Sequence, residues 1–165
     1  MRPSIVNKLV RALIAAAIAT GFGATALAQG AAHGHDAGAE HRLALDDGRK
    51  WATDEPLRAG MTRIRGLLEP RLDAAHAGKL GTAQYKALAS SIEAEVGGIV
   101  ANCKLEPKAD AMLHLVIARI GEGTDAMAGK KPGQRPVNGL ATVVEAVNQY
   151  GSYFDHPGFE PIRDH

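Results

Sequence analysis

Apolar residues recur at helical spacing along much of this chain. Between Glu55 and Ala77 they return every three or four positions, as in a helix that buries one face. The residues of this stripe are Leu57, Met61, Ile64, Leu68 and Leu72. Pro70 falls inside the stretch, and because proline lacks an N–H and its ring is bulky, we expect a kink near Gly66.

A second helix is expected from Thr82, as its N-cap, to about Cys103. Its apolar stripe consists of Tyr85, Leu88, Ile92, Val96, Ile99 and Cys103. Gly97 and Gly98 weaken the middle of this helix relative to alanine. We expect them to permit the close approach of a neighbouring helix.

Two further helices follow. Pro107 opens the third at its first turn, and this helix continues to about Met127. The fourth extends from about Val137 to Phe154. Their inner faces are expected to carry Met112, Leu113, Val116, Ile120, Met127, Leu140, Val143, Val144, Val147, Tyr150 and Phe154. Beyond the fourth helix, Phe159 and Ile162 are expected to fold back onto the core.

Four helices with short links, and no stretch with the alternation of a strand, predict an all-α domain over residues 43–165. The favoured architecture is an antiparallel up-down four-helix bundle. Ahead of the first helix, Asp47-Gly48 predicts a turn. Leu43, Leu45 and Trp51 are expected to dock on the domain, and Thr53 or Asp54 to cap the first helix.

The first 28 residues have the features of a secretory signal peptide. A basic start precedes an apolar run from Ala12 to Phe22, and Ala26-Leu27-Ala28 forms a small-residue cleavage site. The run is shorter than the roughly 18 apolar residues of a membrane span. We therefore expect a periplasmic protein with no stable membrane insertion after cleavage.

Residues 29–42 form an arm rich in Gly, Ala and His. The arm offers little to bury, so we expect it to be disordered. Its His33, His35 and His41 could capture a divalent metal weakly, or could simply be solvated. Signal cleavage lowers the formal net charge from +1 to −2. A slightly acidic chain has no electrostatic reason to bind nucleic acid.

The only cysteine, Cys103, cannot form an internal disulfide. It is expected either to be buried as a small apolar residue or to bind a thiophilic metal. In an up-down bundle, Met112 and His156 could approach it, and His114 lies four residues after Asp110. The candidate ligands are therefore Cys103, Met112, His114 and His156, with copper as the favoured ion.

Motifs for haem attachment, zinc proteases, di-iron sites and serine hydrolases are absent from the sequence. A nucleophilic Cys103 with His156 as its base is conceivable. The sequence shows neither an oxyanion site nor a substrate cleft to support it. We expect a non-enzymatic protein that handles metal.

Two other interpretations stay open. In the first, a metal-free accessory bundle binds a periplasmic protein partner. Asp54 then caps the first helix, Arg58 pairs with a carboxylate and His156 caps the last helix. In the second, the bundle binds haem non-covalently through Met and His. The sequence does not determine the metal, the partner or the oligomeric state.

Three segments of the chain carry a distinctive pattern: Lys50–Met61 (KWATDEPLRAGM), Val100–His114 (VANCKLEPKADAMLH) and Tyr150–Gly158 (YGSYFDHPG). They resemble segments of the DnrO-like family of small exported proteobacterial proteins. The likeness spans residues 43–159 and implies a periplasmic helical domain. It also implies a motif set of Trp51, Asp54, Arg58, Met61, Cys103, Asp110, His114, Asp155 and His156. It implies no cofactor.

Overall fold

The computed structural model describes residues 42–163. Its helices are α1 (Glu55–Leu68), η1 (Glu69–Arg71), α2 (Leu72–His76), α3 (Thr82–Asn102), α4 (Pro107–Met127) and α5 (Pro136–Tyr153). These residues form no β-strand, only isolated bridges. The expected all-α class is therefore confirmed for this part of the chain. The expected signal peptide, the expected arm up to His41 and the last two residues lie outside the described range.

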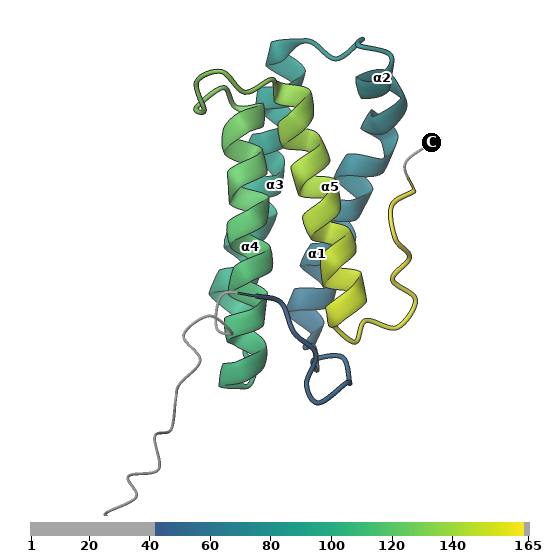
Figure 1. The fold of residues 1–165 in the computed structure, drawn as a ribbon, viewed down its shortest axis with the longest axis vertical. Helices are drawn as coiled ribbons and strands as arrows, with labels where there is room; N and C mark the ends of the chain where they lie inside the picture. The colour runs from purple at the N-terminus through teal and green to yellow at the C-terminus, as the bar shows by residue number, and fades with distance from the viewer. Residues whose placement is uncertain (1–41, 164–165) are drawn as a thin grey trace, which may run out of the picture. The chain divides into compact units, whose positions relative to one another are not determined.

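The long helices lie side by side, with α4 and α5 in front of α3 and α1 in Figure 1. Each is packed against its neighbours: α1 against α3, α3 against α4, α4 against α5 and α5 against α1. The predicted apolar stripes fill the space between them. The largest fully buried side chains are Tyr150, Phe154, Leu57, Met61, Ile64, Leu68, Ile92, Ile99, Leu113, Ile120, Met127 and Val116. Val96, Cys103 and Met112 are only partly buried.

The first expected helix is interrupted at Pro70 itself. Helix α1 continues past Gly66 to Leu68, and the chain then forms the 3-10 turn η1 before α2 begins. The break falls here because the proline ring excludes the carbonyl of residue i−4. The expected kink is thus a change of helix type, located a turn later than predicted. Helix α2 ends at His76, and Gly78 follows with φ of 66°.

Glycines bring the helices close together, but not the glycines that we expected. A Cβ added at Gly97 or Gly98 would meet nothing within 4 Å. In contrast, a Cβ at Gly60 of α1 would lie 2.7 Å from Ile99 Cδ1 of α3. A Cβ at Gly139 of α5 would lie 2.7 Å from the Met127 nitrogen of α4. The prediction for Gly97 and Gly98 was wrong because these residues are on an outward-facing part of α3.

The N-cap of α3 and the position of Leu45 also differ from the predictions. Gly81 is the residue before α3 begins, and Thr82 is the first helical residue; the Gly81 N–H donates to Gln84 Oε1 (2.8 Å). Leu45 does not dock, since 41% of its surface is exposed. Leu43 and Trp51 do contact the core, as expected.

The segment before α1 lies along the end of α5. Asp46 and Arg49 close the predicted turn through two backbone hydrogen bonds, with Asp47 and Gly48 at positive φ. The Trp51 N–H then donates to the Tyr153 carbonyl (2.9 Å), and the Asp155 N–H donates to the Trp51 carbonyl (2.8 Å). The start of the domain is thereby attached to the end of its last helix.

The C-terminal tail folds back as predicted. Ile162 is buried, and its N–H donates to Asn148 Oδ1 (2.7 Å) while Asn148 Nδ2 donates to the Ile162 carbonyl (3.0 Å). None of the helices between residues 42 and 163 combines the length and apolar character that a membrane span requires.

Candidate functional site

Helix α1 begins and α3 and α5 end at the lower end of the molecule in Figure 1. Polar and titratable side chains gather at these helix ends. We call this group the Asp54 cluster; it consists of Asp54, Arg58, Cys103, Tyr150 and His156. Hydrogen bonds place these residues at one end. Asp54 bonds the chain just after α3, and Thr53 Oγ1 donates to the carbonyl of Asp155 just after α5 (2.6 Å).

Asp54, one of the two N-cap candidates in the sequence, is the N-cap of α1. Its Oδ1 accepts the Leu57 N–H (3.0 Å), one of the helix N–H groups that have no partner within the helix. Its Oδ2 accepts the Lys104 N–H (2.6 Å), and the Cys103 thiol also donates to this carboxylate. One side chain therefore joins the first turn of α1 to the link between α3 and α4.

These hydrogen bonds stabilise the charged form of Asp54. Partial burial by itself would raise the pKa of this carboxyl. The donors from Lys104, Leu57 and Cys103 outweigh burial and hold its pKa below the ordinary value. Asp54 is therefore a carboxylate at neutral pH, and it already accepts donors from Leu57, Lys104 and Cys103 of its own chain.

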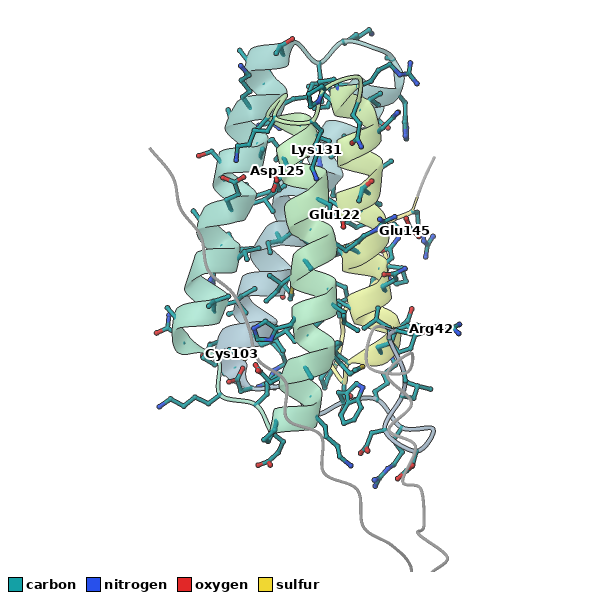
Figure 2. All side chains as sticks on the ribbon, turned by 60° about the vertical axis from the view of Figure 1, so that its left-hand side comes forward. Arg42, Cys103, Glu122, Asp125, Lys131 and Glu145 are labelled. Carbon is teal, nitrogen blue, oxygen red and sulfur yellow. The ribbon has the colours of Figure 1, made fainter. Side chains whose placement is uncertain are left out.

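Cys103 is the C-cap residue of α3 and is half-buried. Figure 2 shows it at the end of α3, away from the labelled acidic residues Glu122 and Asp125 of α4. Burial, the charge of Asp54, the hydrogen bond to Asp54 and the charge of Asp110 together raise its pKa to about 12. The thiol is therefore protonated at neutral pH. Because the thiolate is both the nucleophile and the metal ligand, this environment does not activate Cys103.

Tyr150 is fully buried on α5 and its hydroxyl lies 2.9 Å from His156 Nδ1. Its ring stacks on Phe154 and meets the edge of Phe159, each with ring centroids 5.2 Å apart. Burial raises the pKa of Tyr150, so the hydroxyl keeps its proton. Burial and the nearby Arg58 charge lower the pKa of His156, so the imidazole is neutral at pH 7.

This pair determines which ring nitrogen of His156 carries the proton. Nδ1 of His156 is the hydrogen-bond partner that the described structure gives the Tyr150 hydroxyl, and no buried polar side-chain atom there lacks a partner. We assign the hydroxyl as the donor to Nδ1 and place the imidazole hydrogen on Nε2, because the described residues offer this hydroxyl no other acceptor. A metal bound at Nε2 would require the other tautomer, and Tyr150 would then lose its acceptor.

Arg58 does not pair with a carboxylate, contrary to the sequence-based expectation. Its Nη1 donates to the Thr53 carbonyl (2.7 Å) and to Thr53 Oγ1 (3.0 Å). His156 likewise does not cap α5 but accepts from the Tyr150 side chain. Thr53 thus connects Arg58 of α1 to Asp155 beyond α5, and both interactions hold helix ends together.

The other predicted metal ligands lie on α4. Met112 is partly buried and contacts the core. His114 is exposed, with Nδ1 at 2.9 Å from the Asp110 carbonyl and 3.4 Å from Asp110 Oδ2. Residues two apart on a helix point in nearly opposite directions, so Met112 and His114 do not converge.

Cys103 and His156 are at the same end of the domain, as expected for an up-down arrangement. Cys103 bonds to Asp54, however, and His156 to Tyr150. Between residues 42 and 163 the structure contains no group of three or more His, Cys, Asp or Glu side chains arranged to hold a metal ion. The weak-capture residues His33, His35 and His41 are outside the described range.

The sequence reasoning missed the role of Tyr150 and the second role of Asp54. Tyr150 was assigned only to the apolar stripe of the fourth helix. A buried tyrosine hydroxyl needs a partner, and the histidine just past the end of that helix was the available signal. The Asp54–Lys104 hydrogen bond joins residues 50 positions apart, and nothing in the local sequence indicates it.

Comparison of this chain with protein-family models, with curated proteins and with solved structures finds no match.

Proposed function

We propose that this chain is an exported, non-enzymatic accessory protein, an antiparallel up-down four-helix bundle that binds a partner without a resident metal. The observation that carries the proposal is the Asp54 carboxylate, which accepts donors from Leu57, Lys104 and Cys103. The polar side chains of the Asp54 cluster join separate segments of the chain. The start of α1 and the ends of α3 and α5 meet there, which supports the up-down topology.

The state of the candidate reactive groups supports a non-enzymatic role. A nucleophilic cysteine requires a lowered pKa, whereas that of Cys103 is raised to about 12. A general base requires an unprotonated nitrogen that is free to accept a substrate proton, whereas His156 Nδ1 is occupied by the hydroxyl of a buried tyrosine. Both groups serve the fold instead.

A thermal-shift comparison tests the metal-free proposal. The exported chain is melted with a chelator and, separately, with Cu(I) under reducing conditions. A ligand that binds only the folded state raises the Tm, whereas capture by the His-rich arm affects folded and unfolded chains alike. We expect equal Tm values. A Tm that rises with copper concentration would contradict the proposal.

Metal handling is the second candidate, and one observation favours it. Asp110 is close enough to Cys103 to contribute to its raised pKa, and His114 contacts Asp110. A thiophilic ion such as copper could displace the thiol proton and use Cys103 and His114 after a side-chain rearrangement. Stoichiometric copper retained by a chain lacking residues 29–42, and lost on Cys103→Ala, would support it. No retained copper in either chain would reject it.

Periplasmic localisation and membership of the DnrO-like family are parts of the same proposal. The support for localisation is the basic start, the short apolar run and the Ala-Leu-Ala site of residues 1–28. N-terminal sequencing of the protein from a periplasmic extract tests it. We expect the mature chain to begin at Gln29, and an intact Met1 in that extract would contradict cleavage.

A further inference from the structure

A cleft of about 460 Å³ opens beside the Asp54 cluster. It is lined by Ala52, Thr53, Arg58, Asp155, His156 and Pro157. The two walls come from opposite ends of the domain sequence: one from the segment before α1 and the first turn of α1, the other from the segment after α5. The backbone bonds of Trp51 with Tyr153 and Asp155 hold these walls together. The cleft is therefore part of the folded structure.

Two groups that line this cleft have N–H donors to spare. Arg58 uses Nη1 on Thr53, and the described structure gives its Nη2 and Nε no hydrogen bond. No ion pair joins Arg58 to a carboxylate among residues 42–163. His156 carries its hydrogen on Nε2, because Nδ1 accepts from Tyr150. A guanidinium fork beside a neutral N–H donor is complementary to a planar oxyanion.

Asp155 limits which anion the cleft can accept. Asp155 also lines the cleft, and its backbone N–H and carbonyl are fixed by Trp51 and Thr53. A carboxylate at this position repels an entering anion, and it repels a doubly charged phosphate more than a singly charged carboxylate. The donors and this one negative charge together favour an anion of low charge.

We propose that the cleft formed by Arg58, His156 and Asp155 binds a small monocarboxylate ligand, with Arg58 and His156 Nε2–H as donors and Asp155 as the selectivity element. The inference goes beyond the proposed accessory role, which concerns a protein partner, and adds a small-molecule ligand. Neither a metal nor a reaction is required. The positive charge comes from Arg58 alone.

Titration by NMR tests the proposal on the mature chain. Sodium acetate is added while the side-chain resonances of Arg58 and His156 are followed, with sodium phosphate and sodium chloride at equal ionic strength as comparisons. We expect saturable shifts with acetate, weaker binding of phosphate and no saturable shift with chloride. Equal shifts with all three salts, or no saturation with acetate, would overturn the proposal.

Two variants distinguish binding from misfolding. Arg58→Gln removes the guanidinium and should weaken acetate binding on the order of tenfold or more, whereas Arg71→Gln, on an exposed residue outside the cleft, should not. Asp155→Asn keeps the backbone bonds and removes the repelling charge. It should tighten acetate binding and improve phosphate binding further, a gain that misfolding cannot produce. Unchanged affinity in Asp155→Asn would refute the selectivity role.

The acetate titration and the copper experiment test the two proposals separately. If acetate does not bind while copper leaves the Tm unchanged, the ligand class is wrong and the accessory role stands. If copper raises the Tm, the accessory role is wrong regardless of the acetate result.

Discussion

Asp54 and Lys104 are joined by a hydrogen bond of 2.6 Å between residues 50 positions apart. The same carboxylate caps α1 through Leu57 and accepts the thiol of Cys103. It is thus both a local helix cap and a tertiary contact. Removing the Asp54 side chain leaves donors unpaired in two segments. The resulting loss of stability should therefore exceed the loss caused by removing an ordinary N-cap.

We expect Asp54→Ala to lower the free energy of unfolding by about 2 kcal/mol, at the upper end of the range for N-caps. Chemical denaturation with a chelator present measures this value. Asp73→Ala is the matched control, since Asp73 is an exposed acidic residue in the first turn of α2. It should change stability by less than about 0.5 kcal/mol. Equal effects of the two substitutions would argue against the second role of Asp54.

Alkylation should reveal the protonated state of Cys103. With a pKa of about 12, the native thiol should react slowly with iodoacetamide at about pH 8. Asp54→Asn removes the neighbouring charge and should speed the reaction in native buffer. Both chains should react at the same rate in denaturant. Fast native labelling of the wild-type chain would contradict the geometry of this site.

Stability should fall in acid because of His156. Its pKa in the folded state is below the ordinary value of 6.5, so the unfolded chain binds a proton first as the pH drops. Its contribution is therefore present above about pH 6.5 and is lost as the pH falls through the lower folded-state pKa. The free energy of unfolding, measured between about pH 7 and pH 5, tests this slope.

His156→Gln is the matched variant for that measurement. Its amide oxygen can accept from the Tyr150 hydroxyl, but the side chain does not titrate. The stability of this variant should therefore depend less steeply on pH over the same range. An identical slope in both chains would mean that protonation of His156 is not the cause. Asp54, whose pKa is also lowered, loses its stabilising contribution only at lower pH, below about its ordinary value of 3.8.

Two glycine-to-alanine substitutions should change the stability of the protein in opposite directions. A Cβ at Gly139 would lie 2.7 Å from the Met127 nitrogen and 2.8 Å from Ala126 Cβ, so α4 and α5 would have to separate. We expect Gly139→Ala to cost about 1–3 kcal/mol. Gly97→Ala meets nothing within 4 Å and should stabilise α3 by up to about 1 kcal/mol. Thermal denaturation of both variants gives the comparison.

The helices were predictable because their apolar stripes are long and regular. The core positions of α1, α4 and α5 follow directly from the spacing of residues such as Met61, Leu113 and Val147. Their ends depend on local choices that periodicity does not encode. Gly81 ends up before α3 because Gln84 accepts its N–H, although Thr82 is the better capping residue by type.

The candidate site was predictable only in part. Helix order placed Cys103 and His156 at one end, and the capping rules narrowed the N-cap of α1 to Thr53 or Asp54. The partners could not be deduced, because they depend on contacts between distant segments. Arg58 donates to Thr53 instead of pairing with a carboxylate, and His156 shares a hydrogen bond with Tyr150. The same limit explains Gly97 and Gly98: sequence shows a glycine pair but not which face of α3 is covered.

A double-mutant cycle between Asp54 and Cys103 tests the structural role of the Asp54 cluster most directly. The free energies of unfolding of Asp54→Ala, Cys103→Ala and the double variant are measured with chelator present. Because the two side chains share a hydrogen bond, we predict a coupling energy of about 0.5 kcal/mol or more. A coupling energy of zero would mean that the two residues act independently, and would contradict the account.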